Sequence, residues 1–383
     1  MSRVLLVTPP WEGHINPAAG IATILKSLGH ELAWVGQTAV LHRLGITDRI
    51  FACDPTFNAP ERPAGLHGMA ALEHLWIRCL VPLATCMDTT LSEALDVFRP
   101  DAAVVDQQAI GGALRVHDRG LPWLTLASSP GELAGRQDIH ASIREWTTAS
   151  VQALAHTLGV TRYPDDVLFA PQGTLMPSAP ALMGSVPDTL RVYAIGCLTR
   201  HRLQPSPQPL QKKAAHQVLV SLGTVSGPTG ARFLQAVWQA VLATPDIHWT
   251  IVDPAGSLDG CTAPNATLAR RIDQLALLPA IDAVLCHGGH NTVAESLLHG
   301  CPLVVAPIRD DQPVVAQRVV EANAGLRLRF AHATASHITN AIRCLLSEPA
   351  FRLSAQAIGQ TLTNGEARAT ALLRTWLLMG RMP

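Results

Sequence analysis

Ala283-Val284-Leu285-Cys286-His287-Gly288-Gly289-His290-Asn291-Thr292-Val293-Ala294-Glu295 contains a strand, a glycine turn and the start of a helix in direct succession. Its four apolar leading residues are typical of a buried strand, and helical spacing follows from about Asn291 to His299. Backbone amides are unpaired at the start of such a helix, where the helix dipole is also positive. The stretch therefore predicts an α/β fold with an anion site after this strand.

The same alternation of strand and helix occurs in both halves of the chain. Strand, helix and strand follow one another within the first forty residues, and the pattern begins again near residue 218. Such alternation favours parallel sheets, whose ligands gather beyond the carboxyl ends of the strands. We therefore predict two Rossmann-like domains with parallel sheets that face a central cleft. The other strands are expected at residues 4–7, 32–35, 102–105, 121–126, 218–222, 248–252 and 302–306.

A proline-rich stretch separates the two halves. Gln204-Pro205-Ser206-Pro207-Gln208-Pro209 alternates proline with polar residues, which favours an extended connection over a packed element. We place the N-terminal domain at residues 1–203, the linker at 204–213 and the C-terminal domain at 214–365. Residues 366–383 are expected to form a helix that packs back on the N-terminal domain.

The first helix is predicted to begin at Asn16. Asn16 can cap the helix with its side chain, and Pro17 suits the first turn because no amide hydrogen is needed there. His14 would then lie in a loop, beyond the carboxyl end of the strand at 4–7.

The composition argues against several classes of protein. Hydrophobic residues form 48% of the chain and charged residues 15%, which argues against a disordered or fibrous chain. Lys and Arg together number 29, as do Asp and Glu, so no net charge favours broad binding to nucleic acid or to an anionic membrane. The eight cysteines lack metal or redox spacing, and the N-terminus does not read as a signal peptide. We therefore expect reduced thiols and a cytoplasmic protein.

The side chains around the glycine turn suit a diphosphate. His287 can donate to a phosphate oxygen, and Gly289 lets a ligand approach the backbone. Asn291 and Thr292 add short donors at the helix start, and Glu295 lies about one turn further on, where a carboxylate can accept both hydroxyls of a ribose. Alternatively, the turn is an ordinary connection in which Asn291 and Thr292 only cap the helix.

A second glycine turn, Gly223-Thr224, follows the strand at 218–222 and suits the other side of a diphosphate. The chain has no Walker lysine motif and no G-x-G-x-x-G after its first strand, which disfavours P-loop NTPases and ordinary dinucleotide enzymes. It also has no Asp-x-Asp, so the helix dipole, the amides and His287 would stabilise the diphosphate in place of a divalent cation. We expect no metal ion and no cofactor.

His14 and Asp106 are the candidate catalytic pair. Both follow strands of the same predicted sheet, and an imidazole with an ordinary pKa of ~6.5 can accept a hydroxyl proton near neutral pH. If the two loops converge, Asp106 would orient His14 and stabilise its imidazolium form. Alternatively, His14 is a structural loop histidine and Asp106 caps a turn or a helix.

Four segments occur in the order Arg271–Pro279, His287–Glu295, Gly300–Pro302 and Asp311–Pro313. Together they resemble the donor-binding signature of nucleotide-sugar glycosyltransferases of the GT-B architecture. This group includes plant secondary-metabolite glucosyltransferases and bacterial macrolide and antibiotic glycosyltransferases. The N-terminal stretch Thr8–Pro17 is similar to the acceptor-side loop of the same family, so the resemblance covers nearly the whole chain.

The resemblance implies roles for the matching donor-site residues. The diphosphate would be bound at His287, Asn291 and Thr292 and the ribose at Glu295, while the hydroxyls of the donor sugar would be read by two further residues, Asp311 and Gln312.

The nucleoside would lie near Arg271, Ile272 and Gln274 in the same signature. Arg271 replaces the aromatic residue that often stacks on the base in the plant enzymes. A guanidinium can also stack on a base, so a nucleoside can still be bound here. The replacement leaves open whether the donor is a UDP-sugar or a dTDP-sugar. Asp273 replaces a proline that often precedes the glutamine.

The activity implied is transfer of a sugar, with inversion and without a metal ion, to a hydroxyl or other nucleophile of a small apolar natural product. The resemblance assigns His14 as the base and Asp106 as its partner. Trp11 and Trp76 are the candidate acceptor-binding residues, and each can equally pack a loop or a helix core. The nucleotide sugar is a co-substrate, and oligomeric state cannot be read from the sequence.

Three alternatives remain open at the level of sequence. A sugar-nucleotide epimerase can share the fold and the donor cleft, and release of free sugar without an acceptor would favour it. A lipid-linked-sugar transferase would sediment with vesicles. A non-catalytic partner that binds nucleotide sugar for another transferase would not need His14, Asp106 and the Asp311-Gln312 pair.

Overall fold

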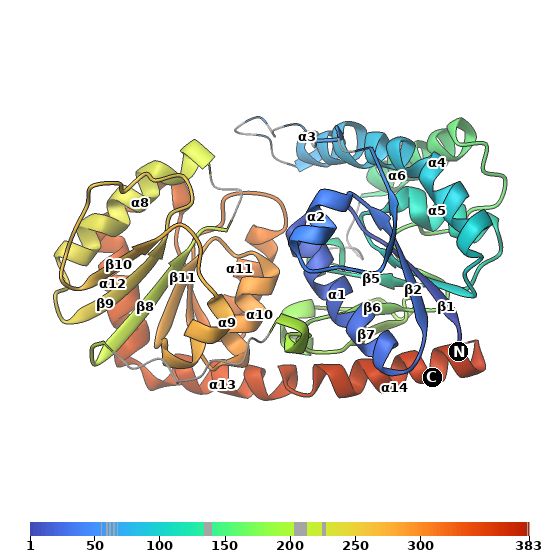
Figure 1. Cartoon of the computed structure of the whole chain (residues 1–383). Coiled ribbons are helices and arrows are strands. Elements are labelled where there is room, and N and C mark those ends of the chain that lie inside the picture. The colour runs from blue at the N-terminus through green and yellow to red at the C-terminus, as the bar shows by residue number, and fades with distance from the viewer. Residues whose placement is uncertain are drawn as a thin grey trace.

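The computed structural model describes residues 1–54, 56–58, 60, 63, 66, 68–133, 140–202, 213–223, 227–380 and 382, with residues 227–229 described by their backbone alone. Two α/β units lie side by side in Figure 1, and each contains one parallel sheet flanked by helices. The predicted fold class, two Rossmann-like units with parallel sheets, is confirmed.

The N-terminal sheet has seven strands among the described residues, in the order β3-β2-β1-β4-β5-β6-β7, and every neighbouring pair is parallel. The order reverses at β1, where β2 and β4 flank the same strand. Clefts that bind ligands form at such reversals, beyond the carboxyl ends of the strands. The strands are β1 (Arg3–Val7), β2 (Glu31–Gly36), β3 (Arg49–Ala52), β4 (Ala102–Asp106), β5 (Trp123–Leu126), β6 (Thr174–Met176) and β7 (Val192–Ala194).

Helices cover both faces of this sheet. In β1, Leu5 and Val7 pack into one apolar cluster while Val4 and Leu6 pack into another, on the opposite face. This explains why the strand is apolar throughout, without alternation. The helices of this unit are α1 (Glu12–Ser27), α2 (Thr38–Arg43), α3 (Gly68–Glu73), the π-helix η1 (His74–Leu80), α4 (Val81–Phe98), α5 (Ile110–Asp118), η2 (Pro130–Leu133), α6 (Ala141–Thr157), α7 (Pro180–Met183) and η3 (Arg200–Arg202).

The C-terminal sheet has six parallel strands among the described residues, in the order β10-β9-β8-β11-β12-β13. Its strands are β8 (His216–Ser221), β9 (Ile247–Val252), β10 (Ala266–Ala269), β11 (Ala283–Cys286), β12 (Leu303–Val305) and β13 (Gly325–Arg327). Its helices are α8 (Gly227–Leu242), α9 (Gln274–Leu277), η4 (Leu278–Ala280), α10 (His290–Leu298), α11 (Gln312–Glu321), η5 (Phe330–His332), α12 (Ala335–Ser347) and α13 (Pro349–Leu362).

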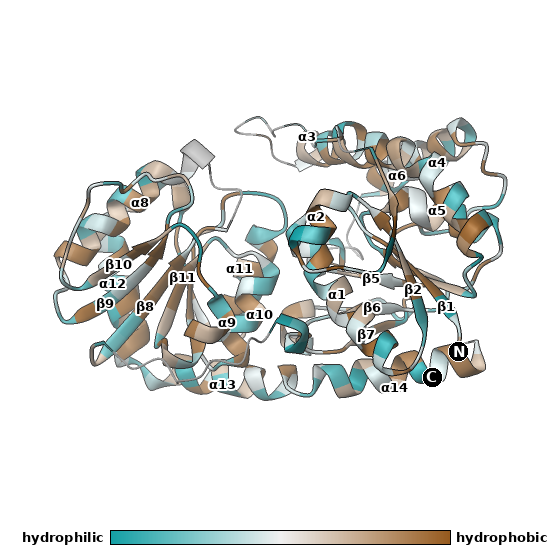
Figure 2. Ribbon diagram, viewed as in Figure 1, coloured by the Kyte–Doolittle hydropathy of each residue, from teal (hydrophilic) through white to brown (hydrophobic). Residues whose placement is uncertain are grey.

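The central strands of both sheets are brown in Figure 2, which marks apolar residues, and the helices carry teal residues on their outer faces. The last helix, α14 (Gly365–Met379), runs from the C-terminal unit along the N-terminal one (Figure 1). Leu373 and Trp376 of α14 are buried in the cluster that also contains Val4 and Leu6. The assignment of residues 366–383 to a helix that returns to the N-terminal domain remains a proposal, which this packing supports.

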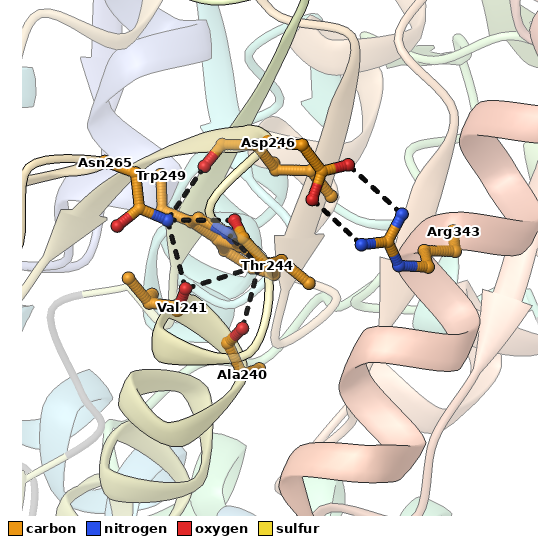
Figure 3. Close-up of polar contacts among 8 residues, drawn as sticks. Ala240, Val241, Thr244, Asp246, Trp249, Asn265 and Arg343 are labelled. Atoms are coloured by element: carbon orange, nitrogen blue, oxygen red, sulfur yellow. Dashed lines mark hydrogen bonds and ion pairs between the residues drawn. The ribbon is translucent and has the colours of Figure 1, made fainter.

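A polar cluster lies at the amino-terminal ends of β9 and β10, and Figure 3 shows its contacts. The side-chain amide of Asn265 donates to the carbonyls of Val241, Thr244 and Ile247 at 3.0, 2.9 and 3.1 Å. The indole of Trp249 donates to the Thr244 hydroxyl at 3.0 Å. These bonds satisfy the backbone where α8 turns into β9, so we assign the cluster a structural role. It also includes the ion pair of Arg343 with Asp246 and the bond from Thr244 to Ala240.

Helix α1 begins at Glu12, four residues before the predicted start at Asn16, so the prediction of this start was wrong. His14 accordingly lies in the first turn of the helix and not in a loop. Pro17 lies inside the helix and has no N–H to donate to the carbonyl of Gly13, four residues before it. That carbonyl is instead paired with the other domain, as described below.

Residues 203–212 lie outside the described part of the chain, and they contain nearly all of the predicted linker 204–213. The predicted limits of the two domains remain a proposal. All eight cysteines are free thiols. Among the described residues, the helical stretch Gly68–Phe98 is long and apolar enough to cross a membrane, a test that core helices also pass. Trp76, Leu83 and Met87 of this stretch pack in the N-terminal core.

Candidate active site

His14 and Asp106 lie side by side at the carboxyl edge of the N-terminal sheet. Asp106 ends β4 and is buried, and His14 lies in the helix that follows β1. The Nδ1 atom of His14 is 2.9 Å from Oδ1 and 3.1 Å from Oδ2 of Asp106, and the Ser128 hydroxyl is 2.8 Å from the same nitrogen. We assign the proton to Nδ1 because this nitrogen faces a carboxylate. Nε2 then carries the lone pair that can accept a proton.

The surroundings of His14 favour its charged form. Burial lowers the pKa of His14, but the charge of Asp106, the hydrogen bond with it and the charge of Asp311 together outweigh burial and raise the pKa above its ordinary value. The side chain keeps 18% of its surface exposed. The ring of Trp11 meets it edge-on, with centroids 5.3 Å apart. His14 is therefore suited to act as a base: it can take up a proton during a reaction, and the carboxylate of Asp106 stabilises the imidazolium that forms.

The imidazole of His287 is held between two glycines. His287 follows β11 at the turn that opens α10. A Cβ atom at Gly223 would lie 2.8 Å from Cε1 of His287, and one at Gly289 would lie 2.6 Å from Nε2. Gly223 also has φ of +72°, which side chains rarely adopt. Both glycines therefore make room for the imidazole, and Thr224 lies outside the described residues.

His287 is neutral near pH 7. The pKa of His287 is lowered to about 4, chiefly by burial and also by the positive charge of Arg309, while a hydrogen bond with the Ser221 carbonyl opposes the shift. A neutral imidazole can donate one hydrogen bond to a phosphate oxygen without carrying a charge of its own. The positive charge at this end of the cleft then comes from the α10 dipole and Arg309.

Asn291 connects the two domains. Its side-chain amide donates at 2.9 Å to the carbonyl of Gly13, which Pro17 leaves unpaired within α1. The first turn of α10 and the first turn of α1 are thereby held together, so His14 and the predicted diphosphate turn face the same space. Thr292 lies beside Asn291 and is half-buried.

Glu295 lies on α10 with both carboxylate oxygens engaged. Arg202 forms an ion pair with Oε1, and Nε2 of Gln274 donates to Oε2 at 2.8 Å. Asp273, whose role the sequence left unexplained, accepts from the amide of Ala276 and so caps the short helix that begins with Gln274. Gln274 and Glu295 are thus brought together, as a shared nucleoside site requires.

Asp311 reaches across the cleft. Its carboxylate accepts a hydrogen bond from the Ser129 hydroxyl, and it makes no side-chain cap to α11. Burial raises the pKa of Asp311, with the charge of Asp310 adding to this and Ser129 and His14 opposing it. Asp311 therefore does not cap α11 with its side chain, and its carboxylate faces the N-terminal domain.

Gln312 supports its own loop. Its Oε1 accepts from the amides of Ile308 and Arg309 at 2.8 and 3.0 Å. Both lone pairs of that oxygen are used, which leaves the amide nitrogen to meet a ligand. The same side chain can therefore shape the loop and donate to a donor sugar.

Four predicted contact residues differ in their surroundings. Trp76 is only 2% exposed and packs edge-on against Trp146, so in this conformation it belongs to the core and offers no wall to an acceptor. Trp11, in contrast, borders His14. Arg271 is exposed and Ile272 half-buried, three and two residues before Gln274. Within the described residues, no group of three or more His, Cys, Asp or Glu is placed to hold a metal ion.

Three side chains that adjoin the candidate site were not predicted from the sequence: Ser128, Ser129 and Arg202. Ser128 and Ser129 follow β5, and the end of a parallel strand was a usable signal for them. Arg202 had no such signal, because it pairs with a residue 93 positions away.

Comparison with known proteins identifies related chains. Residues 246–366 match the family described as "Erythromycin biosynthesis protein CIII-like, C-terminal domain". The 4'-demethylrebeccamycin synthase of Lentzea aerocolonigenes is 25% identical over 92% of this chain and 94% of its own length.

Solved structures share the fold over almost the whole chain. The glycosyltransferase of kitacinnamycin has a TM-score of 0.78 with 24% identity and covers 100% of this chain and 99% of its own. The spinosyn rhamnosyltransferase SpnG, in complex with thymidine diphosphate, has a TM-score of 0.75 with 22% identity and covers 98% and 100%. The chain is a glycosyltransferase with the GT-B fold, related to bacterial antibiotic glycosyltransferases and to UDP-glucosyltransferases.

Proposed function

We propose that this chain transfers a sugar from a UDP-sugar or dTDP-sugar to a hydroxyl of a small apolar natural product, with inversion and without a metal ion. The observation that carries the proposal is the contact of Asn291 with the Gly13 carbonyl. It brings the His14–Asp106 pair of one domain opposite the glycine turn and helix dipole of the other. A base and a leaving-group site on opposite sides of one cleft suit group transfer between two substrates.

The donor half of the proposal rests on α10 and the loops beside it. The free amides at the start of α10 and neutral His287 would donate to the diphosphate, and Arg309 would add a charge nearby. Glu295 and Gln274 would read the ribose, and Asp311 with Gln312 the sugar. SpnG, whose fold is shared, is described in complex with thymidine diphosphate, which supports a nucleoside diphosphate here.

His14 would activate the acceptor. Nε2 would take the proton of the acceptor hydroxyl while the oxygen forms a bond to the anomeric carbon and the bond from that carbon to the diphosphate breaks. The imidazolium that results is stabilised by Asp106 through Nδ1. Because the acceptor attacks from the face opposite the leaving group, a single displacement inverts the anomeric configuration. The natural-product acceptor is inferred from relatives such as 4'-demethylrebeccamycin synthase.

Titration calorimetry with UDP, dTDP and GDP tests the donor half directly. We expect UDP or dTDP to bind and GDP to bind more weakly, and we expect EDTA to leave both binding and the initial rate of transfer unchanged. Failure of every nucleoside diphosphate to bind would contradict the proposal. Strong inhibition by EDTA that Mg²⁺ relieves would overturn its metal-independent form. Release of free sugar with no need for an acceptor would favour an epimerase.

A further inference from the structure

The proposed ribose subsite is closed by an arginine from the other domain. Arg202 pairs with Oε1 of Glu295 while Gln274 binds Oε2, and the Glu295 side chain keeps only 6% of its surface exposed. Ribose hydroxyls cannot reach the carboxylate while both neighbours stay in place. One of the two must move if the proposed function is correct.

Arg202 is the less firmly held of the two neighbours. Gln274 begins α9, which Asp273 caps, and it belongs to the same domain as Glu295. Arg202 ends η3, a helix of only three residues, and belongs to the other domain. Its Nε is buried and finds no hydrogen-bond partner among the described residues. An unpaired buried donor carries a cost, so the guanidinium is incompletely satisfied where it lies.

A small pocket borders the guanidinium. It has a volume of about 20 Å³, is open to solvent on one side, and is lined by Arg202 and Glu295 together with the polar residues Asn16, Thr199 and Asn291. The pocket has room for about one water molecule, so we expect the guanidinium to leave Glu295 toward the open side, where water and these polar groups can accept its hydrogen bonds.

We propose that Arg202 closes the ribose subsite of the free enzyme and leaves Glu295 when a nucleoside diphosphate binds. The inference rests on the proposed function and adds a residue that determines donor affinity. Ribose hydroxyls replace the guanidinium as partners of the carboxylate, so an ion pair between the domains is exchanged for a contact with the ligand. The ligand must therefore carry at least one free hydroxyl at the 2′ or 3′ position of its pentose.

The test is calorimetry of Arg202→Gln with UDP and dTDP. Because no ion pair has to be broken first, we expect this variant to bind the nucleotide that the wild type prefers with a Kd about fivefold lower. Arg200→Gln is the matched control, since Arg200 lies in the same short helix with an exposed side chain and should leave the Kd unchanged. A second probe, 2′,3′-dideoxyuridine diphosphate, has no pentose hydroxyl for Glu295, so the two variants and the wild type should bind it equally.

The pattern of binding across the three ligands distinguishes the proposed role of Arg202 from other roles. Unchanged or weaker binding of UDP and dTDP by Arg202→Gln would overturn the inference, and weaker binding of all three ligands would mean that Arg202 contacts the phosphates. An equal gain for the dideoxy ligand would also overturn it. If Arg202→Gln is unstable, Arg202→Met keeps the apolar stem and allows the same comparison. A wild-type chain that binds neither UDP nor dTDP would overturn the proposed function, and this inference with it.

Discussion

His14 owes its raised pKa to Asp106, and this can be tested by removing one charge. In Asp106→Asn the shape is kept, but the negative charge that favours the imidazolium is lost, so the pKa of His14 should fall. The base must be neutral to act, and activity is therefore lost as pH falls through this pKa. We expect the acidic limb of the kcat/KM profile to move to lower pH, with a lower kcat near pH 8.

Ser128→Ala is the matched control for this experiment. It removes a neighbour of the same nitrogen without removing a charge, so it should leave the acidic limb in place. A limb that stays fixed in Asp106→Asn, in a protein shown to be folded, would mean that Asp106 only supports the turn through its bond to the amide of Gln108.

The candidate site residues that follow from sequence belong to local motifs, and their assignment to the site stays a prediction; the neighbours that tertiary contacts bring to them were not predicted. His14 and Asp106 were identified because each follows a strand, and they do lie together. Ser128 also follows a strand and could have been found by the same signal, whereas Arg202 lies in a short helix that follows no strand of the sheet directly and pairs with Glu295, 93 positions away. Trp76 was a poor candidate because helical spacing does not distinguish a core side chain from a pocket side chain.

At the level of elements, the loop between β12 and α11 gives the sharpest test of the proposed sugar site. Gln312→Glu keeps the oxygen that accepts from Ile308 and Arg309 but removes the amide nitrogen as a donor. The added negative charge should weaken the bare nucleoside diphosphate and the sugar nucleotide alike. If that nitrogen donates to a sugar hydroxyl, the variant should lose several-fold more affinity for the sugar nucleotide than for the bare nucleoside diphosphate. Calorimetry with both ligands measures this.

Equal losses of affinity for the two ligands in Gln312→Glu would restrict Gln312 to the support of its loop. Gln312→Ala provides the comparison. It also removes the acceptor of the Ile308 and Arg309 amides, so it should weaken the binding of both the sugar nucleotide and the bare nucleoside diphosphate.

Strands were predicted best where burial on both faces makes them continuously apolar. The expected strand at 283–286 coincides with β11, and those at 102–105 and 4–7 fall within one residue of β4 and β1. Five strands were not predicted from the sequence: β3, β6, β7, β10 and β13. Four of them, β3, β7, β10 and β13, have few fully buried residues and therefore lack the continuous apolar run of β11, and β6 is a run of only three residues between Gly173 and Pro177.

The start of α1 shows why a local cap signal failed. Asn16 and Pro17 have the residue types of a helix start, yet the helix accepts the proline inside its second turn. The carbonyl that Pro17 leaves unpaired is satisfied by Asn291 from the other domain, a contact that no local pattern reveals.

For the whole molecule, we predict that acid lowers stability. Burial lowers the pKa of His201, His287 and His290 to about 4 each, whereas the unfolded chain titrates near 6.5. Between these values the unfolded chain binds more protons, so the free energy of unfolding should fall as pH falls from about 6.5 to about 4. His14 acts in the opposite direction, because its raised pKa contributes stability below about 6.5 that is lost as pH rises through the folded pKa.

Urea denaturation at pH 7.5, 6 and 5 measures this dependence. His290→Gln should weaken it, since one of the three buried histidines is removed. A free energy of unfolding that stays constant or increases toward pH 5 would contradict the neutral, buried state of these histidines.

Transfer itself tests the central claim most directly. The wild type and His14→Ala would be incubated with UDP- and dTDP-sugars and a set of polycyclic and macrocyclic alcohols, with products followed by mass spectrometry and the anomeric configuration by NMR. We predict that the wild type adds one sugar to an acceptor with inversion and releases the nucleoside diphosphate. In His14→Ala, kcat should fall by at least ~10²-fold while donor binding is kept. Transfer with retention, or near-normal transfer by His14→Ala to a hydroxyl acceptor, would contradict the account.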